Sequence, residues 1–271
     1  MGGEKRINPH APHCGFVMTH ASAPNLSNHL PQRSLTVGIS GASGLIYAVR
    51  SLKYLLEADF TVDVVASRAT YQVWQNEMGI AMPQDPVAQE NFWRDQAGVW
   101  DSGKLICHRW NDIGATIASG SYRTAGMLII PCSMSTVAKL ATGLSSGLLE
   151  RAADVHLKEG RSLVIVPRET PLSTIHLRNL TTLSEVGVRV VPAIPAWYHH
   201  PQTIEDLVDF VVARALDQFG IDCVPLKRWD GGIRQGSPKK AEKTPQIEVK
   251  SNRNGVANAN GAHANGVSAA T

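Results

Sequence analysis

Short apolar runs alternate with amphipathic runs along the central part of the chain. Near-continuous Val, Ile and Leu predict strands at 35–40, 61–67, 125–133, 161–167 and 188–195. Apolar positions at helical spacing predict helices at 44–58, 68–79, 134–143, 147–160, 172–187 and 203–220. Apolar strands that are separated by helices are typical of a parallel sheet covered on both faces. The pattern therefore predicts an α/β fold.

Three other segments lack this periodicity. Residues 80–112 carry prolines and tryptophans, and we expect an irregular connection there. Residues 1–33 mix His, Pro, Asn and Ser and predict a flexible N-terminal extension. Residues 233–271 are rich in Asn, Gly, Ala and Lys and predict a disordered C-terminal tail. The folded domain is then expected at 34–232.

Composition excludes several classes of protein. The chain has 271 residues, 43% of them hydrophobic, which is enough for one sizeable α/β domain. The net charge is only +3, which does not indicate a nucleic-acid-binding protein. No apolar run approaches the roughly 20 residues of a membrane span. We expect a cytoplasmic protein without a membrane span.

The cysteines and histidines give no metal signature. None of the four cysteines stands in C-x-x-C spacing, so neither a zinc site nor a disulfide framework is indicated. Reduced thiols in a cytoplasm are the simple interpretation. His199 and His200 are adjacent, but neighbouring side chains point apart and no ligand cluster accompanies them. We expect no metal.

A glycine turn separates the first predicted strand from the first predicted helix. It reads Gly41-Ala42-Ser43-Gly44, and such turns commonly hold a phosphate at the helix N-terminus. The spacing is not G-x-G-x-x-G, and the second strand ends in Ser67-Arg68 instead of an acid. A tight turn without a ligand and an NADP-dependent reductase both stay open on this evidence. The chain has no Tyr-x-x-x-Lys pair of the kind that a short-chain reductase would need.

A second polar turn follows the strand at 125–133. Ser133, Ser135 and Thr136 lie where a helix begins, whereas plain N-capping needs only one hydroxyl. The carboxyl ends of parallel strands meet at one edge of a sheet. Two polar turns at that edge suit a mononucleotide whose phosphate and ring need separate anchors.

Several charged residues have both a structural and a functional interpretation. Arg151 and Lys158 share a helix face with an acid between them, which is typical of a solvated, ion-paired surface. Arg168 and Glu169 directly follow a buried strand, where a solvated surface is a weaker explanation. Glu77 is a single carboxylate on a helix, and a surface acid is its default interpretation.

Two residues near the last helix are also candidates. Arg214 falls within the apolar stripe of that helix. It is either a core arginine with its head at the surface or a charge directed at an anion across an interface. Tyr198 can bind a phosphate or face a π-system.

Taken together, these stretches resemble the UbiX-type flavin prenyltransferases. The stretches that carry the resemblance are GISGASG, SRAT, PCSMSTVAKLATG, the run from Arg151 to Asn179, the run from 190 to 221, and KRWDGG. They cover almost all of 35–232, and the run from Arg151 to Asn179 is highly specific. The resemblance implies a flavodoxin-like Rossmann three-layer α/β/α sandwich with a parallel sheet. It also implies a homododecamer whose active sites are shared between neighbouring subunits.

The resemblance implies a metal-independent prenyl transfer. The substrates would be reduced FMN and dimethylallyl phosphate, with the prenyl group joined to N5 and C6 of the flavin. The product, prenylated FMN, would serve a UbiD-type decarboxylase in ubiquinone biosynthesis or aromatic acid decarboxylation. Without magnesium, basic side chains must take the leaving phosphate.

The family's functional residues carry over to positions of this chain. Flavin binding would fall on Gly41, Ala42, Ser43, Ser67, Ser133, Met134, Ser135, Thr136 and Arg151. The prenyl phosphate would fall on Lys158, Arg168, Tyr198 and Arg214, with Ser43 alongside and Trp229 closing the site. Glu169 would protonate the departing phosphate, and Glu77 would help to remove the flavin C6 proton.

Two other functions are alternatives to the prenyltransferase, and the first of them shares its fold and cofactor. FMN-dependent cysteine decarboxylases carry a catalytic histidine and an Asn-bearing motif that are not recognisable here. An FMN-binding accessory subunit would not need Lys158, Arg168 and Arg214 together. Their joint presence favours the prenyltransferase.

Overall fold

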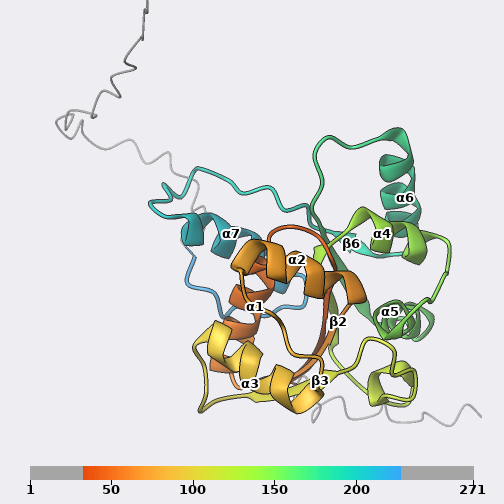
Figure 1. The fold of residues 1–271 in the computed structure, drawn as a ribbon. Coiled ribbons are helices and arrows are strands. Elements are labelled where there is room, and N and C mark those ends of the chain that lie inside the picture. The colour runs from red at the N-terminus through yellow and green to blue at the C-terminus, as the bar shows by residue number, and fades with distance from the viewer. Residues whose placement is uncertain (1–32, 227–271) are drawn as a thin grey trace, which may run out of the picture. The chain divides into compact units, whose positions relative to one another are not determined.

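One parallel sheet with strand order β3-β2-β1-β4-β5-β6 forms the centre of the protein (Figure 1). The computed structural model describes residues 33–226. The predicted C-terminal tail, nearly all of the predicted N-terminal extension and Trp229 lie outside the described residues. The predicted domain limits therefore stay a prediction.

The strands and helices alternate along the chain, as the apolar pattern predicts. The strands are β1 Ser34–Ile39, β2 Thr61–Ala66, β3 Lys104–His108, β4 Gly126–Cys132, β5 Ser162–Pro167 and β6 Arg189–Val190. The helices are α1 Ile46–Glu57, α2 Arg68–Met78, α3 Pro86–Ala97, α4 Met134–Ala141, α5 Leu148–Lys158, α6 Thr174–Glu185 and α7 Ile204–Asp217. A 3-10 turn, η1, spans Thr116–Ala118. The predicted flavodoxin-like three-layer α/β/α sandwich with a parallel sheet is confirmed, and the strand order reverses between β1 and β4.

Helices cover both faces of the sheet. Helices α1, α3 and α7 lie together on one face, and α4, α5 and α6 lie on the other (Figure 1). Each face has its own apolar cluster of buried side chains. Gly38 lies at the second of these faces, where a Cβ would approach Met127 and Leu149 within 3.0 and 3.3 Å. This glycine therefore serves close packing of α5 on the sheet.

The prediction of an irregular connection over 80–112 was wrong. Helix α3 begins at Pro86, which fits the first helical position because that position needs no N–H donor. The Asp85 side chain caps the helix by accepting from the backbone N–H groups of Val87 and Ala88. Pro86 thus starts a helix in a stretch whose prolines had suggested an irregular connection.

The predicted strand at 188–195 was too long. Only Arg189 and Val190 form β6. Pro192 has no N–H to donate to a strand ladder, so regular pairing ends before it. The chain nevertheless continues beside β5, since the Ala193 N–H bonds the Pro167 carbonyl at 3.1 Å.

Strand β3 supplies one of the two partners of a buried acid in β2, and the loop after η1 supplies the other. Asp63 is fully buried, and its carboxylate contacts His108 Nε2 and the Tyr122 hydroxyl, each at 2.8 Å. Burial and the bond to Asp63 raise the pKa of Tyr122 to about 12. The polar network explains how an acid is accommodated within a central strand.

A second polar network joins α1 to α7. The Asp209 carboxylate accepts from Arg50 Nε at 2.7 Å and from the Tyr54 hydroxyl at 2.5 Å. The Arg50 and Asp209 side chains are 20% and 12% exposed. Burial and the bond to Asp209 raise the pKa of Tyr54, so its hydroxyl stays a donor.

Asp209→Ala is expected to lower the free energy of unfolding by about 2–3 kcal/mol, because it leaves the Arg50 charge partly buried without its partner. Urea unfolding would measure the change. Glu57→Ala is the control: it removes an exposed pair with Lys53 whose atoms are 3.8 Å apart, and should cost below about 0.5 kcal/mol. Equal losses in the two variants would contradict a stabilising role for the buried pair.

Within residues 33–226, none of the helices has the length and apolar character needed to cross a bilayer.

Candidate active site

Two turns meet at the point where the strand order reverses. The fully buried Ser40 follows β1, and its hydroxyl donates to the Pro131 carbonyl at 3.0 Å. The same oxygen accepts from the Ser133 N–H at 2.6 Å. The Ser40 side chain thus ties the glycine turn after β1 to the serine turn after β4.

A cavity of about 920 Å³ opens beside these turns. It lies at the carboxyl ends of the strands, where open parallel sheets bind their ligands. Five of the residues predicted to bind the cofactor line it: Gly41, Ser67, Ser133, Ser135 and Thr136. The structure therefore brings together residues from three separate loops of the sequence.

The start of α4 gives the cavity its polar wall. Ser133 caps the helix, since its side chain accepts from the Thr136 N–H at 3.2 Å. Ser135 is not needed for capping and also lines the cavity. The prediction that these hydroxyls exceed what plain capping requires agrees with this arrangement.

Gly41 has no space for a side chain. A Cβ at this position would lie 2.9 Å from the backbone carbonyl carbon of Ala69 in α2. The turn after β1 therefore packs directly on the first turn of α2, which closes one side of the cavity.

The other residues predicted to bind the cofactor do not present side chains to this cavity. Ala42 and Met134 are buried. Ser43 is exposed. Arg151 forms an ion pair with Asp154 at 2.8 Å, as expected if this helix face is a solvated, ion-paired surface. The cofactor-binding roles of all nine residues stay predictions.

Three predicted residues gather around the N-terminus of α1. Arg168 Nε donates to the Ser43 carbonyl at 3.1 Å. The Glu77 carboxylate accepts from the N–H groups of Gly44, at 3.0 and 3.2 Å, and Leu45, at 3.2 Å. A carboxylate is stabilised there because unpaired N–H groups and the helix dipole favour negative charge. Glu77 thus has a specific position, which its isolated place in the sequence did not indicate.

Glu169 is exposed beside Arg168, at the carboxyl end of β5. Its Oε1 accepts from the Thr170 N–H at 3.1 Å. The side chain is therefore oriented by its own backbone and accessible to a ligand.

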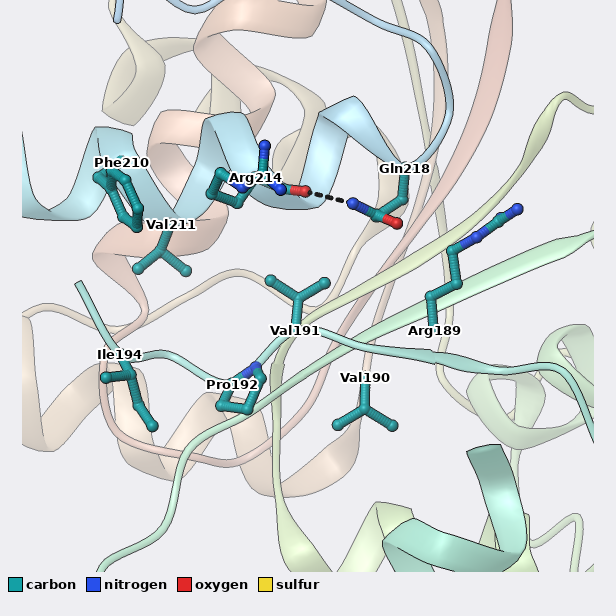
Figure 2. Close-up of a pocket in the computed structure, with 9 residues that line it drawn as sticks. All are labelled: Arg189, Val190, Val191, Pro192, Ile194, Phe210, Val211, Arg214 and Gln218. Carbon is teal, nitrogen blue, oxygen red and sulfur yellow. Dashed lines mark hydrogen bonds between the residues drawn. The ribbon is translucent and has the colours of Figure 1, made fainter. Parts of the chain in front are cut away.

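Arg214 lies at a separate groove, of about 360 Å³, between α7 and the segment around β6 (Figure 2). Its side chain is 48% exposed and bound to Asp217 at 2.7 Å. Both interpretations of Arg214 stay open, because a core arginine with its head at the surface and a charge directed across an interface would each be exposed in one chain. Tyr198 lies nearby, with its ring 5.8 Å from that of Phe210, another residue of the groove.

Lys158 is far from both places within one chain. It ends α5, four residues before β5 begins, and so lies toward the amino ends of the strands. Its Nζ contacts Glu159 Oε1 at 2.5 Å. One copy of the chain does not bring Lys158 together with Arg168 and Arg214.

Comparison with known proteins identifies a family of flavoproteins. The Flavoprotein family model matches residues 24–216. Flavin prenyltransferase UbiX from Synechocystis is 74% identical over 199 residues, which cover 73% of this chain and 97% of that protein. The chain belongs to the UbiX family of flavin prenyltransferases.

Two solved UbiX structures share the fold. The dodecameric FMN-dependent UbiX-like decarboxylase from Escherichia coli O157:H7 is 45% identical, with a TM-score of 0.63 over 73% of this chain and 100% of that chain. AnUbiX (PadA1) in complex with FMN and dimethylallyl pyrophosphate is 36% identical, with a TM-score of 0.65 over 74% of this chain and 98% of that chain.

The UbiX cavity of this chain fits FMN in size and chemistry. Small-molecule sites commonly occupy about 300–1,000 Å³, and this cavity lies within that range. Hydroxyl donors at the start of α4 suit an anion or a ring edge. Burial raises the pKa of the adjacent Cys132 thiol, and the nearby Glu150 carboxylate adds to the shift. This thiol therefore stays protonated at neutral pH.

Several cavity residues were missed by the sequence analysis. They are Ala69, Tyr71, Gln72, Gln84, Trp110, Lys139, Ser146, Gly147, Leu149 and Glu150. Arg68, the residue that kept the NADP-dependent reductase open in the sequence, also lines the cavity. Trp110 and Gln84 lie in the stretch that was taken as irregular. Lys139 and Glu150 are 11 positions apart on different helices and resemble ordinary surface charges in the sequence. Among residues 33–226, no three His, Cys, Asp or Glu side chains gather as metal ligands.

Proposed function

We propose that the chain joins the dimethylallyl group of dimethylallyl phosphate to reduced FMN and so forms prenylated FMN. The observation that carries this proposal is the cavity at the β1/β4 edge, lined by hydroxyls and backbone N–H groups in a member of the UbiX family. The basic and acidic side chains proposed for phosphate departure, Arg168 and Glu169, lie on the loop after β5, where Arg168 contacts the Ser43 carbonyl of the glycine turn.

The chain's own residues have distinct tasks in this proposal. Gly41, Ser67 and the Ser133–Thr136 turn hold FMN, which when bound and reduced supplies the nucleophilic ring. Arg168 binds the phosphate of the prenyl substrate, and Glu169 gives a proton to the phosphate oxygen as the C–O bond breaks. Glu77 accepts the proton that the flavin ring loses.

The remaining phosphate ligands support a site shared between subunits. Lys158, Tyr198 and Arg214 are exposed or half-exposed and lie away from the cavity of their own chain. In a homododecamer, a neighbouring subunit would bring such residues to the rim of the cavity. A dodecamer is the assembly of the related Escherichia coli O157:H7 protein.

The product is proposed to pass to a UbiD-type decarboxylase in the cytoplasm. A cytoplasmic location agrees with the cysteines at 107, 132 and 223, all of which are free thiols.

Mass spectrometry tests the reaction directly. The purified chain is mixed anaerobically with reduced FMN and dimethylallyl monophosphate, and the flavin is then released. We expect a mass equal to FMN plus one dimethylallyl unit. Bound but unmodified FMN would contradict the prenyltransferase and leave a flavoprotein of the same fold.

Arg214→Ala is expected to raise the KM for dimethylallyl phosphate roughly tenfold, since a charged hydrogen bond to phosphate contributes about 1.5 kcal/mol or more. FMN affinity should hardly change. Arg189→Ala is the matched control, because Arg189 lines the same groove and no phosphate contact is assigned to it. An equal loss of FMN and prenyl phosphate binding would instead make Arg214 a structural residue.

A further inference from the structure

An ion pair that the sequence analysis missed lies in the wall of the flavin cavity. Lys139 Nζ on α4 contacts Glu150 Oε1 on α5 at 2.9 Å. The Glu150 side chain is 6% exposed and that of Lys139 is 32% exposed. Both residues line the 920 Å³ cavity. The pair therefore presents a positive and a negative group to the same space.

Burying a carboxylate is costly unless it is well paired. Gly147, at the start of α5, leaves space beside the Glu150 carboxylate. A Cβ at Gly147 would lie 3.3 Å from Glu150 Oε2 and 3.0 Å from the Trp110 carbonyl oxygen. A glycine at this position thus keeps the Oε2 side of the carboxylate open.

Both partners keep unused hydrogen-bonding capacity. Within residues 33–226, the Lys139 contact is the one hydrogen bond that Glu150 makes through its side chain, and it involves Oε1. Oε2 is therefore an acceptor without a donor. The Lys139 ammonium has three N–H groups and uses one of them on Glu150. An acceptor and a donor are thus available side by side.

The flavin ring carries a matching edge. Its pyrimidine part contains an imide, in which one N–H donor lies between two carbonyl acceptors. We propose that Lys139 and Glu150 recognise this imide edge, with Glu150 accepting from the ring N–H and Lys139 donating to a flanking carbonyl oxygen. The inference rests on the proposed function, because it assigns specificity residues to the FMN of that reaction.

A site of this kind rejects a ligand that lacks the donor, because the buried acceptor is then left unpaired. FMN methylated at the imide nitrogen, N3-methyl-FMN, removes the donor and leaves the rest of the molecule unchanged. Wild-type protein should bind FMN at least about thirtyfold more tightly than N3-methyl-FMN.

The test compares the two flavins by fluorescence titration of three proteins. In Lys139→Met/Glu150→Leu both charges are removed together, so that neither is left buried alone. The affinities of this variant for FMN and for N3-methyl-FMN should differ by no more than about threefold. The control, Lys53→Met/Glu57→Leu, removes an exposed pair on α1 outside the cavity and should keep the wild-type preference.

The outcomes separate the inference from the proposed function. If wild-type protein binds FMN and N3-methyl-FMN with similar affinity, the inference is overturned and the proposed function is not. This comparison uses wild-type protein only, so it does not depend on the folding of any variant. A preference that persists in Lys139→Met/Glu150→Leu would also overturn it. Failure of wild-type protein to bind FMN at all would contradict the proposed function and the inference with it.

Discussion

Glu169→Gln is expected to reduce turnover by about 10²–10⁴-fold while FMN binding stays unchanged. A general acid contributes a factor of this size, and glutamine has no acidic proton to give to the departing phosphate. Its amide oxygen can still accept from the Thr170 N–H, as Glu169 Oε1 does at 3.1 Å. Anaerobic turnover, followed by the mass of the released flavin, and FMN titration would measure the two effects separately.

Glu185→Gln provides the control for this substitution, because Glu185 is an exposed acid at the end of α6 with no assigned role. It should leave turnover intact. If Glu169→Gln also left turnover intact, Glu169 would be removed from the mechanism. If FMN binding fell in parallel with turnover, the side chain would be holding the site together instead of donating a proton.

Gly41→Ala is expected to weaken FMN binding by roughly a hundredfold. The added methyl group meets the Ala69 backbone, whose carbonyl carbon lies 2.9 Å from the new Cβ, and a backbone cannot turn aside as a side chain can. Overpacking of this kind costs about 3 kcal/mol. The turn must move away from α2, and this displaces a wall of the cavity. FMN titration would detect the change.

The control is Gly114→Ala, where the nearest atom to a new Cβ is Asp112 Oδ1 at 3.4 Å, an ordinary contact. This variant should bind FMN like the wild type. Unchanged FMN affinity in Gly41→Ala would show that the turn can shift without affecting the ligand. The close packing on Ala69 would then be unimportant for binding.

The alternation of buried strands and amphipathic helices was sufficient to predict the sheet. Val, Ile and Leu in β1, β2, β4 and β5 are buried on both faces, so their apolar runs are visible without any structure. The helix predicted at 203–220 is α7, and a Thr203–Asp206 capping box marks its start. Periodicity succeeded wherever burial decided which residue types a segment could carry.

The parts that sequence reasoning missed depend on contacts between distant segments. Strand β3 pairs with β2 and supplies His108 to Asp63, but neither fact leaves a local pattern. Glu77 is placed at the N-terminus of α1 by packing of α2, 32 or more positions away. Lys139 and Glu150 are likewise brought together only by the fold.

The two polar turns were predicted separately, and the structure joins them through one hydroxyl. Because the Ser40 oxygen bonds both Pro131 and Ser133, neither turn can adjust its backbone without disturbing the other. Energetic effects of substitutions in the two turns should therefore be non-additive, as is usual for residues that share a hydrogen-bond network. A thermodynamic cycle across Gly41 and Ser133 would report one cooperative unit. Exchanging either loop alone for a loop of different geometry is then expected to disturb both turns.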